Sequence, residues 1–266
     1  MSGAMEASPL QRAVLGVLFS TVVAVVYLPI LVMIVFSFNS GRFQTMPFRR
    51  FITDWYGRAV FDQQYVDGLL NSLTLSGSVC LISTAIAFLC AYSLVNAEFP
   101  GKTLVTAFVL APLAVPLVLI GISMRLYFVS LGLEPSLGLA AAGQVIYVMP
   151  LAILNLRNRI AQIPKSQEEA AWTLGASRLR SMLEILLPNC KLALIATGIL
   201  TFTFAFDEFV IAYFLTNFSI TLPIKIWTSL VTGFDPTINA VGTLVFLFSM
   251  ALGLASQLLL MREAKR

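Results

Sequence analysis

The chain has 266 residues, of which 58% are hydrophobic and only 11% are charged. A soluble domain carries roughly a quarter charged residues, so this composition excludes an ordinary water-soluble fold and places the chain in a bilayer. The net charge of +4 does not indicate nucleic-acid binding, because the basic residues lie between apolar runs and form no stripe with aromatic residues. Histidine is absent and the three cysteines fit no zinc or redox spacing, so we expect no metal, no cofactor and no catalytic residue.

Six apolar runs are long enough to cross a hydrocarbon core about 30 Å thick, which takes about 20 helical residues. Only helices or closed barrels satisfy their backbone in lipid, and the alternation of barrel strands is missing. We therefore expect an all-α polytopic membrane protein, in which the first run is too long for a signal peptide and remains as an anchor. The expected spans are Ala13–Phe36, Leu69–Val95, Thr103–Val129, Leu137–Leu156, Leu192–Leu215 and Ile238–Met261.

Prolines are expected to modify two regions of this plan. Pro112 and Pro116 lie inside the third run, where each frees a carbonyl and kinks the helix, for reasons of shape or of gating. Residues 216–237, between the fifth and sixth runs, contain two prolines and a glycine. This stretch predicts a short partial helix followed by a turn.

The basic residues predict the orientation of the chain. An even number of spans puts both termini on one side, and eleven of the seventeen Lys and Arg residues fall on that side together with residues 157–191. Cytoplasmic loops carry the excess of positive charge, so both termini and this segment are expected in the cytoplasm. No linker, repeat or low-complexity tract divides the rest, and residues 1–266 are expected to form one transmembrane domain.

Residues 157–191 predict a helix–turn–helix at the membrane surface. Ser166 and Glu169 have the S-x-x-E spacing of a capping box that starts a short helix. Gly175 suits the left-handed residue that follows a helix end. Ser177 can cap a second helix over Arg178–Leu187.

The same segment carries a longer pattern, E-A-A-x3-G-x9-I-x-L-P. It resembles the motif of the permease subunits of bacterial binding-protein-dependent ABC importers. The matching residues are Glu169, Ala170, Ala171, Gly175, Ile185, Leu187 and Pro188.

This resemblance implies the fold of a type I ABC importer permease, with a coupling loop at about 157–191 that docks into a groove of an ATPase subunit dimer. It implies that Glu169 fixes the helix start and meets a basic residue of the ATPase, while Ala170 and Ala171 permit close approach. Gly175 would make the turn, and Pro188 would set the angle into the fifth span. The chain lacks the G-x-x-x-x-G-K-[ST] phosphate loop, so ATP hydrolysis is expected to belong to the partner subunits.

A wider resemblance covers most of the chain and is to the polyamine (spermidine/putrescine) branch of these permeases. It implies a second, related permease subunit, a periplasmic substrate-binding protein, a surrounding lipid bilayer and a bacterial inner-membrane location. Related branches share much of the pattern and carry other small organic solutes, such as opines, amino-acid derivatives or phosphonates. The segments that carry this wider resemblance are Ser37-Phe38-Asn39-Ser40, Trp55-Tyr56, Asn71-Ser72, Phe202–Phe214 and the tail from Leu222-Pro223 through Gly233, Pro236, Asn239-Ala240 and Thr243.

Two carboxylates interrupt the fifth run. Asp207 lies 16 residues beyond Lys191, about 24 Å along a helix at 1.5 Å per residue, in the outer half of the membrane. A carboxylate there is costly unless it faces water, a partner or a cargo, and adjacent helical residues point about 100° apart. At least one of Asp207 and Glu208 is therefore a candidate for a cationic cargo; otherwise the pair marks a helix break or meets a basic residue of the partner. The aromatic residues expected nearby are Phe204, Phe206, Tyr213 and Trp227.

Three further interpretations remain. Arg125, near the outer end of the third span, either pairs with these carboxylates or extends its charge to the interface. An intramembrane enzyme is disfavoured, since the spans contain no histidine and no metal cluster, and two carboxylates alone support only proton transfer. A purely structural membrane scaffold would not require the seven-residue pattern.

Overall fold

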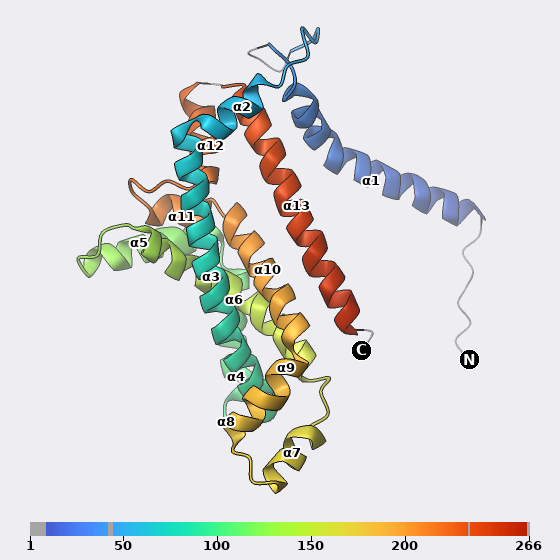
Figure 1. The fold of residues 1–266 in the computed structure, drawn as a ribbon, viewed down its shortest axis with the longest axis vertical. Helices are drawn as coiled ribbons and strands as arrows, with labels where there is room; N and C mark the ends of the chain where they lie inside the picture. The colour runs from blue at the N-terminus through green and yellow to red at the C-terminus, as the bar shows by residue number, and fades with distance from the viewer. Residues whose placement is uncertain (1–8, 42–44, 234, 265–266) are drawn as a thin grey trace. The chain divides into compact units, whose positions relative to one another are not determined.

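The computed structural model describes residues 9–41, 45–233 and 235–264, and within these ranges the regular elements are helices, with one isolated antiparallel bridge between Asn39 and Phe51 (Figure 1). The two ends of the chain, for which the charge count predicts a cytoplasmic position, fall at residues 1–8 and 265–266, outside the described residues. The all-helical architecture predicted from the apolar runs is confirmed.

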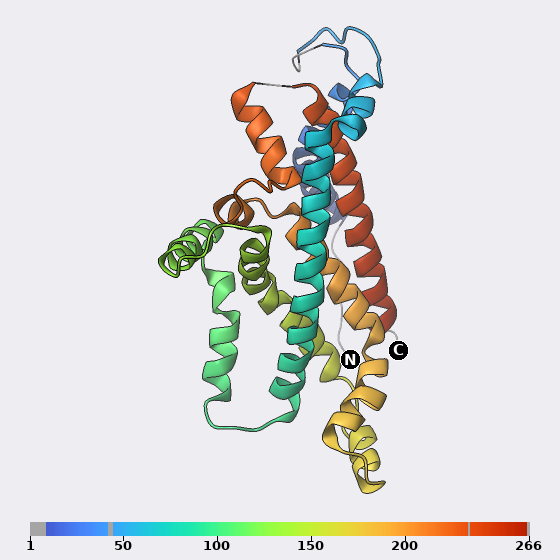
Figure 2. The same ribbon diagram turned by 60° about the vertical axis from the view of Figure 1, so that its left-hand side comes forward.

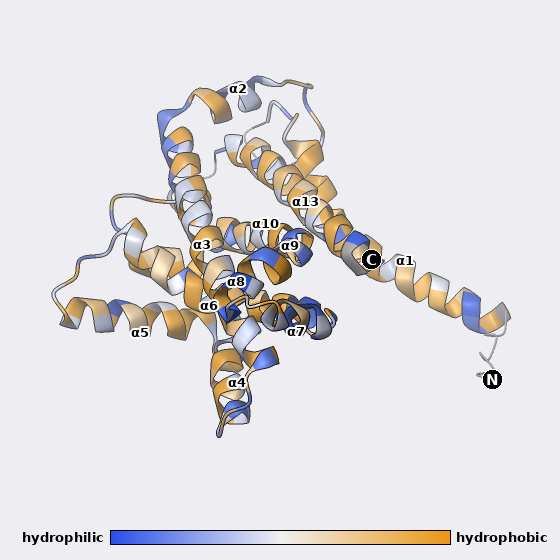
Figure 3. Cartoon of the chain, turned by 60° about the horizontal axis from the view of Figure 1, so that its bottom comes forward, coloured by the Kyte–Doolittle hydropathy of each residue, from blue (hydrophilic) through white to orange (hydrophobic). Residues whose placement is uncertain are grey.

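Four of the six expected spans are single helices that are long and apolar enough to cross a membrane. Hydrophobic colour covers most of the first and last of them in Figure 3. The helix α3 begins six residues before the expected Leu69, because Asp62 caps it by accepting the Gln64 amide at 2.8 Å. The four helices are α1 (Pro9–Phe36), α3 (Gln63–Asn96), α6 (Leu137–Ile160) and α13 (Thr237–Ala264).

The third expected span is broken rather than kinked. It consists of α4 (Lys102–Leu110), the 3-10 turn η1 (Ala111–Ala114) and α5 (Leu117–Ser130), and its two parts meet at 103°. The physical reason is the second proline, which disfavours a helical conformation at the residue before it. Val115 is accordingly extended, with φ −95° and ψ 127°. The kink expected from Pro112 and Pro116 within Thr103–Val129 is therefore a full break between two helices.

The fifth expected span is also divided. It consists of α10 (Lys191–Asp207) and α11 (Val210–Leu215), with Glu208 extended between them. The segment before it, α8 (Arg178–Ser181), the π-helical turn η2 (Met182–Leu186) and α9 (Leu187–Asn189), meets α10 at 75°. If each bent pair counts as one span, the described residues provide up to six.

The chain forms two compact units, residues 1–61 with 229–245 and residues 62–228 with 246–266. In the first unit, polar contacts hold the segment after α1 to the helix α2 (Asp54–Phe61). The Trp55 Nε1 donates to the Asn39 carbonyl at 2.9 Å, and the hydroxyls of Ser37 and Tyr56 lie 2.7 Å apart. The partial helix expected within 216–237 is α12 (Leu222–Thr232).

In the second unit, α3 packs along α6 and α10, and small residues bring these helices close together. The thiol of Cys80 donates to the Gly198 carbonyl at 3.1 Å, and Cys190 is buried beside Leu186 and Ala193. Cys80 and Cys190 thus serve as small packing residues between these helices. The α7–α8 hairpin, in which α7 is Ser166–Thr173, projects beyond one end of α3 and α10 in Figure 2.

Gly143 of α6 provides a test of this packing. A Cβ at this position would lie 2.7 Å from both Ile211 Cγ2 and Leu215 Cδ1, so we expect Gly143→Val to displace α11. The overpacking should lower the free energy of unfolding by about 1–3 kcal/mol, measured as a lower melting temperature in detergent. Gly77→Val is the matched control, because a Cβ there meets nothing within 4 Å. Equal melting temperatures for the two variants would contradict the close contact.

Candidate functional site

The first candidate site is the hairpin formed by α7 and α8. Its turn is built on Gly175, which has a φ of +91°. The Gly175 amide donates to the Trp172 carbonyl, and the Ala176 amide donates to the Ala171 carbonyl, both at 3.0 Å. This pair of hydrogen bonds is a Schellman motif, which ends a helix with a left-handed residue. The turn predicted at Gly175 is confirmed.

The start of α7 differs from the predicted capping box. Ser166 lies inside the helix, Lys165 stands at the N-cap, and no side chain caps the helix there. The amides of Glu168 and Glu169 both donate to the Lys165 carbonyl at 3.0 Å. Proline at 164 explains the shift, because its fixed φ begins the helical turn earlier than the serine. The Ser166–Glu169 capping box was a wrong prediction.

Two adjacent glutamates of α7 point in different directions. Glu168 is only 5% exposed, and its Oε1 accepts hydrogen bonds from Ser181 Oγ at 3.0 Å and from Tyr92 OH at 3.3 Å. Glu169 is exposed, and its carboxylate makes no hydrogen bond or ion pair with the described part of the chain. Sequence reasoning selected Glu169 and missed Glu168, although the 100° between adjacent helical residues already implied that only one of them could face outward.

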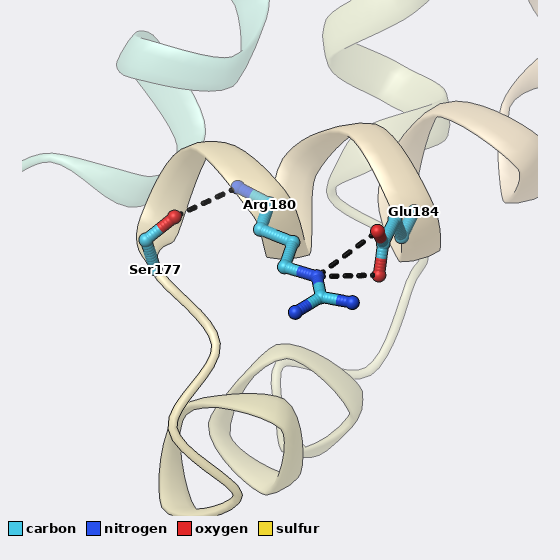
Figure 4. Close-up of polar contacts among 3 residues, drawn as sticks. All are labelled: Ser177, Arg180 and Glu184. Carbon is cyan, nitrogen blue, oxygen red and sulfur yellow. Dashed lines mark hydrogen bonds and ion pairs between the residues drawn. The ribbon is translucent and has the colours of Figure 1, made fainter.

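The second helix of the hairpin begins as predicted. Ser177 caps α8, since its Oγ accepts the Arg180 amide at 3.2 Å, and the Arg180 guanidinium pairs with Glu184 at 3.0 Å (Figure 4). The helical path continues two residues past the expected end at Leu187. A π-helical turn makes this possible, because Pro188 has no amide and its ring cannot approach the carbonyl four residues earlier.

The seven residues of the pattern differ in exposure, and none of them is fully buried. Glu169, Ala170, Gly175 and Pro188 are exposed, and Ala171, Ile185 and Leu187 are half-buried. Apolar side chains surround the exposed ones: Leu174 is 89% exposed and Leu179 is 62% exposed. The hairpin therefore exposes large apolar side chains together with small residues and the charged Arg178 and Arg180, a mixed surface that a partner could contact.

The second candidate site is the break between α10 and α11, which depends on Glu208. This carboxylate is only 6% exposed and accepts three hydrogen bonds. Its donors are the amide of Ile211 at 2.7 Å, the amide of Ala212 at 3.1 Å and Nε2 of Gln144 at 3.0 Å. Because the first two are the free amides at the start of α11, Glu208 acts as the cap of that helix. Of the interpretations offered for the pair, the helix break is the one observed.

Asp207, unlike the buried Glu208, lies at the surface. It is exposed, and its Oδ1 accepts one hydrogen bond from Ser249 Oγ at 2.9 Å. It borders a pocket of about 440 Å³ that also contains aromatic rings, those of Tyr147 and Phe204, whose centroids lie 6.5 Å apart. The pocket is lined by Leu117, Tyr147, Thr203, Phe204, Asp207, Glu208, Phe209 and Val210.

The expected aromatic residues are only partly brought together. Phe204 lines the pocket, whereas Phe206 is 2% exposed and packs against Phe248 away from it. Tyr213 and Trp227 are half-exposed, and each has its ring within 5.5 Å of the ring of Phe209. Phe209 was missed although it follows the carboxylates directly. Tyr147 was missed because only the packing of α6 against α10 reveals it.

Arg125 pairs with neither carboxylate. Its Nη1 donates to the Phe214 carbonyl at 2.7 Å, near the C-terminal end of α11, where a cation is favourable. No group of three or more cysteine, aspartate or glutamate side chains within residues 9–41, 45–233 and 235–264 could hold a metal ion. The break between α10 and α11 can attract a cation through the exposed carboxylate of Asp207 and the aromatic rings near it.

The two carboxylates predict different responses to neutralisation. In Glu208→Gln, a side-chain NH2 would face donors at Ala212 or Gln144, and the buried mismatch should cost about 1–3 kcal/mol of folding free energy. Asp207→Asn keeps an acceptor for Ser249 and should melt as the wild type does. Thermal unfolding of both purified variants makes the comparison. A Glu208→Gln variant as stable as Asp207→Asn would contradict the capping role.

Comparison with known proteins agrees with this geometry. The chain is 29% identical to the spermidine/putrescine transport system permease protein PotC of Escherichia coli (strain K12), over 96% of each chain. It is 30% identical to the putrescine transport system permease protein PotI of the same strain, over 82% of this chain and 80% of the relative. These relatives are permease proteins, in agreement with the expectation that this chain is not the ATPase.

Solved structures show the same fold. A bacterial ABC transporter involved in the import of the acidic polysaccharide alginate superposes with a TM-score of 0.67 at 18% identity, covering 94% of this chain and 95% of that chain. The MetNI methionine ABC transporter superposes with a TM-score of 0.61 at 17% identity, covering 74% and 95%. The predicted fold of an ABC importer permease is thereby confirmed.

Residues 83–265 match the family described as binding-protein-dependent transport system inner membrane component. This match covers more than half of the chain and includes both candidate sites. The chain is therefore a membrane-spanning permease component of an importer, and it belongs to the family of binding-protein-dependent transport system inner membrane components.

Proposed function

We propose that this chain carries polyamines such as putrescine and spermidine across the bacterial inner membrane into the cytoplasm, as one permease subunit of an ATP-driven importer. The observation that carries the cargo assignment is the pocket at Asp207, where an exposed carboxylate stands beside aromatic rings within a membrane-spanning region. The names of the two polyamine permeases that resemble this chain support the same cargo.

The chemistry of the pocket suits a flexible polycation. Asp207 makes one hydrogen bond, to Ser249, which leaves acceptor capacity for an ammonium group. Phe204, Tyr147 and Phe209 can offer ring faces and edges to the alkyl chain and to a second ammonium. Glu208 contributes by holding the break open rather than by contacting the cargo. Tyr213 and Trp227 would extend the path beside Phe209.

The α7–α8 hairpin would couple this pathway to ATP hydrolysis. Its exposed Leu174 and Leu179 would enter a groove of an ATPase subunit, with two such subunits in the complete importer. Glu169 lies free at the surface, where it could meet a basic residue of that partner, and Ala170 allows close approach. Pro188 and the 75° bend that follows it would turn movement of the hairpin into movement of α10.

The remaining parts of the proposal concern assembly. A second, related permease would complete the translocation path, and a periplasmic substrate-binding protein would deliver the cargo. Both termini and the 157–191 loop would lie in the cytoplasm, in keeping with the excess of Lys and Arg on that side. Residues 1–266 would act as a single transmembrane permease domain surrounded by lipid.

Uptake of labelled putrescine and spermidine by cells that express the whole gene cluster tests the cargo. Asp207→Asn should raise the concentration for half-maximal uptake about tenfold or more, because a charge-assisted hydrogen bond is lost. Basal ATP hydrolysis should remain. Glu134→Gln removes an exposed carboxylate outside the pocket and serves as the control. If an assembled, ATP-hydrolysing wild-type importer takes up no polyamine, the cargo belongs among other small organic solutes, such as opines, amino-acid derivatives or phosphonates.

The coupling role has its own test. Gly175→Val forces a β-branched residue to a φ of +91° and should lower transport about tenfold, with membrane insertion unchanged. Gly175→Asn, which tolerates this conformation better, should retain most of the activity. Glu169→Lys should lower transport as well, by reversing the charge offered to the ATPase. Full transport by Gly175→Val and Glu169→Lys would show that the hairpin does not couple the subunits.

A further inference from the structure

The buried carboxylate of α7 joins three elements that are separate in the sequence. Glu168 lies on α7, Ser181 on α8 and Tyr92 near the end of α3, and both hydroxyls donate to the same oxygen, Oε1. Glu168 is 5% exposed and Ser181 is 1% exposed. Glu168 lies outside the seven-residue pattern of the coupling loop, and the proposed roles of that loop do not use it.

A carboxylate in this position needs a reason, because burying a charge is costly unless hydrogen bonds compensate it. The position in the first turn of α7 is favourable, since free amides there attract negative charge. Two hydroxyl donors then hold one oxygen. The hydroxyl oxygens of Ser181 and Tyr92 lie 3.0 Å and 3.3 Å from it, so the junction ties α7 to both α8 and α3.

The helix α3 is the element through which this junction reaches the membrane. Near Tyr92, the residues Ala91 and Leu94 pack in a buried cluster with Ile153 of α6. Nearer its other end, Leu75 and Val79 pack in a second buried cluster, which includes residues of α6, α10 and α11. A 34-residue helix that belongs to both clusters can carry a displacement from the hairpin toward the elements that line the Asp207 pocket.

We propose that Glu168 is a positioning residue that fastens the coupling hairpin to α3, so that movement of α7 is delivered to the membrane helices through Tyr92 as well as along the chain. This inference rests on the proposed role of the hairpin in contacting the ATPase. It assigns the two neighbouring glutamates complementary tasks, Glu169 toward the partner and Glu168 toward the membrane core.

The test is hydrogen–deuterium exchange on the complete importer in nanodiscs, with and without a non-hydrolysable ATP analogue. In the wild type, the analogue should change exchange both in residues 166–174 and in residues 92–96. Glu168→Ala should keep the response of 166–174 and reduce that of 92–96 about threefold or more, since two hydrogen bonds are lost. In Glu168→Gln the side-chain oxygen still accepts hydrogen bonds from both hydroxyls, so residues 92–96 should respond to the analogue as they do in the wild type.

Two matched variants separate positioning from folding. Glu184→Ala removes an exposed glutamate of η2, the turn that follows the hairpin, and should leave both responses unchanged. If Glu168→Ala fails to assemble, Tyr92→Phe and Ser181→Ala take its place, because each removes one donor without leaving a buried charge alone. Tyr92→Phe should weaken the response of residues 92–96 and lower the cargo moved per ATP hydrolysed, with melting temperature within a few degrees of the wild type.

Each outcome has a definite meaning. Equal responses of residues 92–96 in wild type, Glu168→Ala and Tyr92→Phe would overturn the proposal, as would a loss that Glu168→Gln does not restore. If the hydrogen–deuterium exchange of residues 166–174 in the wild type does not change when the analogue binds, the hairpin does not have the coupling role. The fastening role of Glu168 is then refuted as well. Since the exchange measurement needs no cargo, a wrong polyamine assignment would appear only in the uptake experiment and would leave the result on Glu168 intact.

Discussion

A carboxylate withdrawn from water must find hydrogen-bond donors, and this requirement shapes the centre of the permease. Glu208 meets it by taking the free amides of Ile211 and Ala212 and the side-chain amide of Gln144. A continuous helix would have used those backbone amides itself, so α10 has to end where the carboxylate begins to accept them. The break then leaves Asp207 at the last turn of α10, exposed beside the pocket.

The same division of labour occurs twice in the chain. At Glu168–Glu169 and at Asp207–Glu208, one carboxylate is buried among donors and its neighbour is exposed. At Glu168–Glu169 the cause is the 100° between adjacent helical positions, whereas at Asp207–Glu208 it is the extended backbone of Glu208, which turns the second carboxylate away from the first. The hydrogen bonds of the buried carboxylate fix the local backbone. The exposed carboxylate is thereby held in a defined position, from which it can contact a partner or a cargo.

The sequence predicted features whose cause is local. Hydropathy predicted the four unbroken spans, and the need for a left-handed residue predicted the turn at Gly175. At Asp207–Glu208 the sequence left the helix break as one of several interpretations, because one of the three donors to Glu208 is Gln144, 64 residues earlier. The capping box was predicted wrongly because two local signals competed. Ser166 favours a helix that starts after it, whereas Pro164 begins the helical turn earlier. The pocket itself required knowing that Tyr147 packs beside α10.

The contact between Gln144 and Glu208 also bears on how the protein is made. Residues 191–215 form one apolar run that Asp207 and Glu208 interrupt, and one of the three donors to the buried carboxylate is a side chain of α6. Since α6 precedes α10 in the chain, ribosomal synthesis delivers Gln144 to the membrane before the acid that needs it. A circularly permuted gene that began at α10 would reverse that order and leave the carboxylate in the membrane without one of its three donors during biogenesis.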